Sequence, residues 1–62
     1  MIEDLPENIR RTVAALLRLK EATASDVARL TGRKRATESH YLNILHSLDI
    51  VRKKKVGRKI YY

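Results

Sequence analysis

Apolar side chains at helical spacing, interrupted by turn-forming residues, constrain the fold of this chain more than any other feature. The first such stretch has apolar residues at positions i, i+4, i+7 and i+8, namely Ile9, Val13, Leu16 and Leu17. They fall on one face of a helix that we expect over about residues 6–20, with Pro6 in its first turn and Asp4 as its cap. Because the 62 residues include no cysteine, we expect one domain, 1–62, that depends on its apolar core alone.

Gly32 separates two further helical patterns. Before it, Thr23 and Asp26 have the spacing of a capping box, which predicts a helix of two turns that ends at Gly32. After it, we expect a crossing helix over about residues 35–48. The apolar face of that helix is formed by Tyr41, Leu42, Leu45 and Leu48. A helix of two turns is not stable alone, so the two helices are expected to pack closely.

The last residues change from helical to strand-forming composition. Asp49 tolerates a left-handed backbone and is expected to reverse the chain after the third helix. Two short runs rich in β-branched and aromatic residues follow, 50–55 and 59–62, around a turn at Gly57. The predicted fold class is therefore α+β, with three helices followed by a two-stranded β-hairpin. A short third strand near residues 22–24 is a further candidate.

The net charge of +7 lies entirely in the second half of the chain. Residues 1–32 hold five basic and five acidic residues, whereas residues 33–62 hold nine basic residues against two acidic ones. Such segregation is typical of a surface that meets a polyanion, and nucleic acid is the expected partner. A solvated basic tail is the alternative interpretation. It is disfavoured because β-branched and aromatic residues are interleaved with the basic ones, whereas disordered tails are poor in both.

The predicted helix over residues 35–48 has an unusual outer face. The residues opposite its apolar side are Ala36, Ser39, His40, Asn43 and Ser47. They are mostly polar but uncharged, whereas a helix that merely faces solvent usually displays Glu and Lys. Short hydrogen-bonding side chains can meet the edges of bases, and Arg33, Lys34 and Arg35 beside them can meet phosphates.

Helix, short helix, glycine turn, helix and basic hairpin is the order of elements in a winged helix-turn-helix domain. Residues 22–62 resemble the DNA-binding domain of small prokaryotic regulators of the ArsR and MarR kind. The helix and turn over residues 23–32, with Ala28 and Gly32 four residues apart, resemble the positioning helix of that motif. The segments similar to its helix end, wing entry and wing tip are 42–45, 50–53 and 56–62.

The resemblance implies sequence-specific binding of double-stranded DNA by a transcriptional regulator. The recognition helix, about residues 35–48, would lie in the major groove, and the basic wing, residues 51–62, on the backbone or in the minor groove. Base or near-base contacts would come from Arg35, Ala36, Thr37, Ser39 and His40, with Asn43 on an adenine or a phosphate. Phosphate contacts would come from Arg33, Lys34, Lys53, Lys54, Lys55, Arg58 and Lys59.

The chain departs from the resembled families at three positions. Those families usually carry aliphatic side chains where Arg33 and Glu38 stand, and a Ser or Thr cap where Lys34 stands. An unpaired buried carboxylate would cost several kcal/mol. We therefore expect Glu38 at the rim of the core or in an ion pair, with Arg35 one turn earlier as the candidate partner.

Neither catalysis nor metal binding is indicated by the sequence. His40 and His46 lie about 120° apart around a helix axis, so they cannot share an ion within one helix, and no cysteine is present. No nucleophile with a neighbouring base and no glycine-rich phosphate loop occurs, so we expect no enzyme activity and no cofactor. No small-molecule effector is expected either.

Other uses of the same fold stay open. A winged helix can serve as a protein-protein interaction module, as a binder of Z-form nucleic acid or double-stranded RNA, or as a binder without sequence preference. The prolines and tryptophan expected in the wing of Z-form binders are absent from residues 51–62. No apolar run approaches the roughly 18 residues of a membrane span, so we expect a cytoplasmic protein on the nucleoid. A homodimer would use the first helix, where Leu19 lies at the edge of the apolar stripe.

Overall fold

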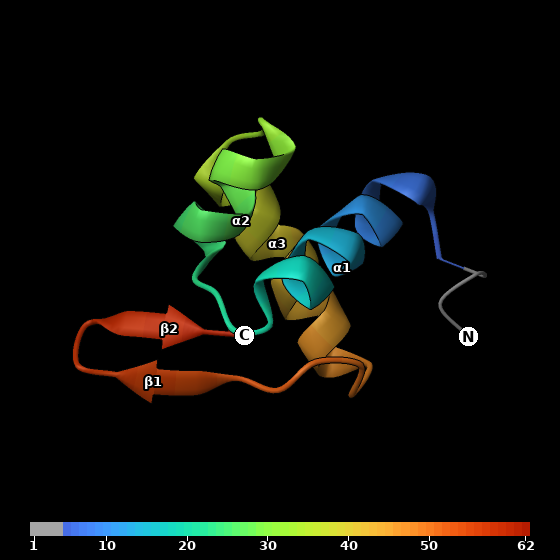
Figure 1. Ribbon diagram of the computed structural model, residues 1–62. Coiled ribbons are helices and arrows are strands. Elements are labelled where there is room, and N and C mark those ends of the chain that lie inside the picture. The colour runs from blue at the N-terminus through green and yellow to red at the C-terminus, as the bar shows by residue number, and fades with distance from the viewer. Residues whose placement is uncertain (1–4) are drawn as a thin grey trace.

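The computed structural model describes residues 5–62, which form three helices followed by a two-stranded antiparallel hairpin (Figure 1). The elements are α1 (Glu7–Leu19), α2 (Ala24–Thr31), α3 (Arg35–Ser47), β1 (Lys54–Val56) and β2 (Lys59–Tyr61). This α+β layout is consistent with a winged-helix arrangement and confirms the predicted fold class. The expected cap at Asp4 lies outside the described residues. None of the helices within residues 5–62 is long and apolar enough to cross a membrane.

The buried face of α1 differs from the expected one. The side chains that it buries are Ile9, Thr12, Val13, Ala15 and Leu16. Leu17, expected in the core, is 71% exposed, because the helix is turned so that Thr12 and Ala15 flank the buried stripe in its place. The prediction for Leu17 is therefore wrong. The helix ends at Leu19, and Lys20 leaves it with a left-handed φ of 70°.

α2 begins and ends as its local sequence predicts. The Thr23 side chain accepts a hydrogen bond from the backbone N–H of Asp26 at 3.1 Å, and the Asp26 carboxylate accepts one from the backbone N–H of Thr23 at 3.2 Å. At the other end, Gly32 has a φ of 78° and its N–H donates to the carbonyl of Ala28 at 2.8 Å. Both the capping box and the glycine turn are confirmed.

α3 crosses the other two helices and carries the centre of the core. Leu42 and Leu45 are fully buried, the first in a cluster with α1 and α2 residues and the second in a cluster with α1 residues. Leu48, expected on the apolar face, is instead 54% exposed. It follows the last helical residue, where the chain is already reversing, and so lies beyond the surface that α3 buries. Asp49 has the expected left-handed backbone, with a φ of 59°.

The hairpin is shorter than the sequence suggests. β1 and β2 pair antiparallel, with Lys54 opposite Tyr61, and Gly57 makes the turn with a φ of 61°. Residues 50–53, expected in the first strand, run to the hairpin without strand pairing. The hairpin projects beyond the helices (Figure 1), and most of its side chains are exposed.

A single residue pair takes the place of the third strand expected near residues 22–24. The Ala22 N–H donates to the carbonyl of Tyr62 at 3.2 Å, and the Tyr62 N–H donates to the carbonyl of Ala22 at 2.8 Å. These two bonds follow directly from the end of β2. They fix the hairpin to the segment between α1 and α2.

The capping box predicts that part of the stability of α2 depends on pH. The backbone N–H of Thr23, and then its side chain, hold the pKa of Asp26 below its usual value of 3.8. Because the folded pKa is the lower one, the ionised carboxylate stabilises the fold above pH 3.8, and this contribution is lost as the pH falls through the folded value. Asp26→Asn is therefore expected to destabilise the protein at pH 7 and to approach the wild type in acid. Urea unfolding over a pH series measures this difference.

A matched control is Glu21→Gln, because Glu21 is exposed and has no role in the capping box. Thr23→Ala removes the other half of the box and should lower the free energy of unfolding by about 1 kcal/mol. A difference between Asp26→Asn and the wild type that does not change with acidification would contradict the assigned role.

Candidate nucleic-acid interface

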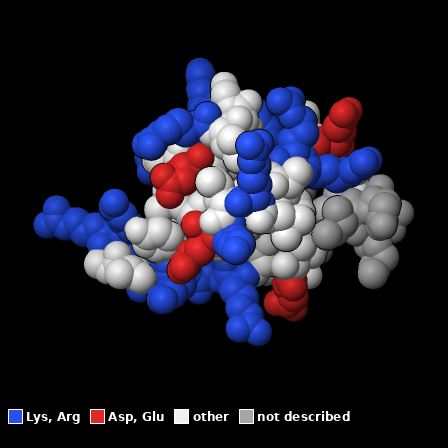
Figure 2. Space-filling view, viewed as in Figure 1, with Lys and Arg blue, Asp and Glu red and all other residues white. Residues whose placement is uncertain are grey.

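The predicted contact residues lie mainly on the outer face of α3 and on the hairpin. At α3, the exposed ones are Lys34, Arg35, Ala36, His40 and Asn43, and the half-buried ones are Thr37 and Ser39. At the hairpin and just before it, the exposed ones are Lys53, Lys54, Lys55, Arg58 and Lys59. Figure 2 shows Lys and Arg side chains along the hairpin, at the left of the view, and others spread over the rest of the visible face. These groups are accessible to a large anionic partner.

Residues from both predicted contact elements meet in one hollow. Arg35 and Ser39 line it from α3. Arg58 and Lys59 line it from the hairpin. The hollow has a volume of about 330 Å³. The start of α3 and the turn of the hairpin are therefore neighbours on one surface, although about twenty residues separate them in the sequence.

Tyr62 connects α3 to the base of the hairpin, a role that the sequence did not indicate. Its hydroxyl donates to the side-chain oxygen of Asn43 at 3.1 Å, and the ammonium of Lys53 donates to the same oxygen at 3.3 Å. The Lys53 ammonium also lies 5.9 Å from the centre of the Tyr62 ring. Burial raises the pKa of the Tyr62 hydroxyl, which therefore remains a donor at neutral pH.

This contact bears on the interpretation of Asn43 as a reader of adenine. A bidentate contact to adenine uses the amide oxygen as an acceptor and the amide nitrogen as a donor. The oxygen of Asn43 already accepts from Lys53 and Tyr62 within the protein. Reading an adenine would therefore require these two bonds to break, whereas the contact as it stands orients the hairpin against α3.

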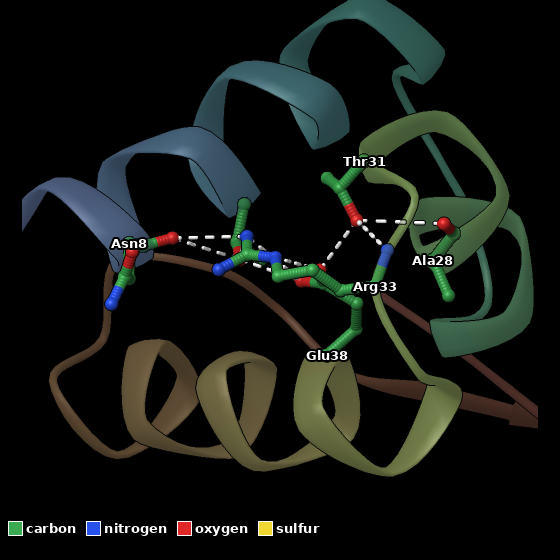
Figure 3. Close-up of polar contacts among 6 residues, drawn as sticks. Asn8, Ala28, Thr31, Arg33 and Glu38 are labelled. Carbon is green, nitrogen blue, oxygen red and sulfur yellow. Dashed lines mark hydrogen bonds and ion pairs between the residues drawn. The ribbon is translucent and has the colours of Figure 1, made fainter.

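A buried charge network joins the three helices (Figure 3). Glu38 of α3 has no exposed surface. Its carboxylate accepts hydrogen bonds of 2.6 Å from the hydroxyl of Thr12 in α1 and of 2.6 Å from the hydroxyl of Thr31 in α2. The Nε atom of Arg33 lies 2.7 Å from the same carboxylate. The Nε–H is not directed at that oxygen, so this contact is an ion pair without hydrogen-bond geometry.

Arg33 occupies a different place from the one that its sequence position suggested. Its Nη2 atom donates to the carbonyl of Asn8 at 3.0 Å and to the hydroxyl of Thr12 at 2.9 Å, and its guanidinium lies 5.0 Å from the ring centre of Tyr41. Only 18% of its side-chain surface is exposed. The position of Arg33 therefore does not support its assignment to the phosphate-binding surface.

Glu38 was expected either at the rim of the core or in an ion pair. It is in an ion pair, but its partner is not Arg35. Arg35 is exposed at the start of α3, whereas Glu38 points at α1 and α2. Arg33 lies in the turn between α2 and α3, and from there its side chain reaches the carboxylate of Glu38. The candidate partner inferred from helical spacing is therefore wrong, and the rim position is wrong as well.

The two histidines have separate surroundings. His46 places its Nδ1 atom 3.3 Å from the carbonyl of Val51, where it can tie the end of α3 to the segment before the hairpin. His40 is exposed, with its ring 5.9 Å from that of Tyr41. Among residues 5–62, no group of three or more His, Asp or Glu side chains is arranged to hold a metal ion.

Comparison with known proteins identifies one close relative. The chain is 68% identical over all of its 62 residues to an uncharacterized protein of Archaeoglobus fulgidus, and it spans 84% of that protein. No family model matches the chain, and no solved structure matches it. No activity is known for this relative from its name, so the similarity assigns none to this chain.

The charge network predicts a large loss of stability when one partner is removed. Glu38→Gln keeps the shape of the side chain but leaves the guanidinium of Arg33 without its counter-charge, so the free energy of unfolding should fall by about 3 kcal/mol or more. The double variant Arg33→Met/Glu38→Leu contains no uncompensated charge and should recover most of this loss. Urea denaturation of Glu38→Gln, of the single variants Arg33→Met and Glu38→Leu, and of the double variant measures both effects.

Glu7→Gln supplies the control, since Glu7 is an exposed carboxylate at the start of α1. It should change the free energy of unfolding by less than about 0.5 kcal/mol. Losses that simply add in the double variant would show that Arg33 and Glu38 do not act as a pair.

Proposed function

We propose that this chain, which belongs to the same family as the uncharacterized protein of Archaeoglobus fulgidus, is a winged helix-turn-helix protein that binds double-stranded DNA sequence-specifically and regulates transcription. The observation that carries this proposal is that the start of α3, through Arg35 and Ser39, and the basic hairpin line one hollow. In this role the protein acts in the cytoplasm, on the nucleoid.

The proposed geometry divides the contacts between two elements. α3 enters the major groove, where Ala36 can meet a thymine methyl group and His40 can meet a base edge. The hairpin lies along the backbone, and Arg58 beside its turn can enter a narrow minor groove. Lys54 and Lys59 on the two strands neutralise phosphates.

A protein-protein interaction module is the main alternative, and the charge distribution disfavours it. Residues 49–62 hold six basic residues against one acidic residue. Those in the hairpin lie on two short paired strands, and most of their side chains are exposed. Like charges gathered in this way repel one another, and a phosphate backbone compensates them more fully than an ordinary protein surface does.

We also propose that the protein pairs with a second copy of itself through α1. A mainly apolar hollow of about 570 Å³ lies between the second half of α1 and the segment before the hairpin, and Leu17 and Ile50 expose apolar surface there. Lys20 and Glu21 also line it, so that a two-fold axis can place each against the opposite charge of the other copy. A single domain covers only a few base pairs, and a dimer doubles the recognised site.

The proposed DNA binding predicts different effects of hairpin and α3 variants. If about six to eight phosphates are neutralised, the logarithm of the binding constant should fall against the logarithm of salt concentration with a slope of about −5 to −7. Arg58→Ala and Lys59→Ala should weaken binding to all duplexes alike, whereas His40→Ala should change the preference among sequences. Duplexes selected from a random pool, titrated by fluorescence anisotropy, provide the measurement.

Two results would refute these assignments. A binding constant that does not change over the salt series would remove duplex DNA as the main partner. Equal losses of His40→Ala on selected and random duplexes would show that α3 does not read bases.

The proposed dimer is tested by Leu17→Glu, which places a charge in the apolar hollow. Because Leu17 is 71% exposed in the single chain, the fold should tolerate the change while self-association is weakened. Sedimentation equilibrium of the wild type and variant measures this. Leu48→Glu is the matched control, since Leu48 is 54% exposed and does not line the hollow. A wild type that stays monomeric at all concentrations would refute the dimer.

A further inference from the structure

The hollow between α3 and the hairpin has a third wall that the assignment of contacts from the sequence does not include. Ser25 and Arg29 line it from α2, and Thr23 lines it from the cap that precedes this helix. Figure 1 shows α2 and strand β2 on the same side of the molecule, so this wall faces the hairpin. All three residues belong to the first half of the chain, whose net charge is zero.

The charge inside the hollow is strongly positive. Four basic side chains line it from three different elements, namely Arg29, Arg35, Arg58 and Lys59. Asp26 is the one carboxylate among its lining residues, and hydrogen bonds from Thr23 already engage it. Cations held by separate elements around one space repel one another when it is empty, and an anion relieves that repulsion.

Two side chains of the α2 wall are available for such an anion. Ser25 and Arg29 are exposed, and no side-chain hydrogen bond of either is found within residues 5–62, although the charge of Arg29 helps to lower the pKa of Asp26. The hydroxyl of Thr23, in contrast, is engaged with Asp26, because it accepts from the N–H of that residue and helps to lower the pKa of its carboxylate. A hydroxyl and a guanidinium are the groups that tetrahedral phosphate oxygens accept from most readily.

We infer that this hollow binds a phosphate group of the DNA backbone, with Arg29 as its contact on α2. The inference rests on the proposed function, because a strand that passes from α3 to the hairpin crosses the space between them. Three elements then hold one strand, and the register of α3 in the groove depends on α2 as well as on the hairpin. A free inorganic phosphate has the same chemistry and is the other source that the test must separate.

The first test is Arg29→Ala, measured on duplex DNA over a salt series. Binding to every duplex should weaken by about three- to five-fold, and the salt slope should become less steep by about one. Arg11→Ala is the matched control, since it removes an exposed helical arginine that does not line the hollow. Arg58→Ala is measured beside both, because its loss tests DNA binding itself.

The second test is Ser25→Asp, which separates binding from folding. An acidic residue in the first turn of α2 favours the helix, so the free energy of unfolding should not fall. The same carboxylate repels a phosphate in the hollow, so duplex affinity should fall. A variant that is as stable as the wild type and yet binds DNA more weakly is the expected result.

The outcomes distinguish the two claims. If Arg58→Ala weakens duplex binding while Arg29→Ala and Ser25→Asp do not, the phosphate contact at α2 is wrong and the proposed function stands. If none of the three variants changes duplex binding, the contacts assigned to the hollow and to Arg58 are both wrong. If the wild type binds no duplex at all, the proposed function fails and the inference fails with it. If inorganic phosphate shifts the NMR signals of Ser25 and Arg29 and duplex DNA does not, the hollow takes a free anion and the inference is overturned.

Discussion

The position of α3 depends above all on the buried contact between Glu38 and its donors. A carboxylate without any exposed surface is tolerated only when its oxygens are satisfied and its charge is balanced. Here α3 supplies the carboxylate, and its partners come from α1, from α2 and from the turn between α2 and α3, through Thr12, Thr31 and Arg33. A rotation of any helix would leave a buried charge short of a partner. Apolar contacts alone tolerate such shifts much better, so the network makes one arrangement of the helices strongly preferred.

The hairpin needs a different kind of support, because a two-stranded hairpin with exposed side chains is at best marginally stable alone. Tyr62 provides that support twice. Its backbone pairs with Ala22, and its hydroxyl contacts Asn43 on α3. The charge network therefore orients α3 against the helices, and Tyr62 orients the hairpin against α3. The candidate interface exists as one surface only because both constraints act on the same helix.

The features that the sequence predicted correctly depend on neighbouring residues. The capping box of Thr23 and Asp26, the turn at Gly32 and the reversal at Asp49 each follow from backbone preferences over a few positions. The burial of Leu17 was predicted wrongly because helical spacing defines the buried face of a helix only to within about one residue. The hydrogen bond from Thr12 to Glu38 sets the rotation of α1 and leaves Leu17 exposed. Glu38 did stand out as a departure from the resembled families. Its partner could not be found from helical spacing, because Arg33 lies in the turn before the helix and not within it.

The internal use of Arg33 also strengthens the electrostatic argument for a polyanionic partner. Arg33 and Glu38 form a neutral pair, so the whole net charge of the second half remains on the eight other basic residues and Asp49. Each of these nine residues is exposed. A buried pair contributes nothing to the release of counterions, whereas exposed cations that approach phosphates contribute directly. The salt dependence of DNA binding should therefore follow the exposed basic residues of α3 and the hairpin, together with Arg29 of α2, and should not include Arg33.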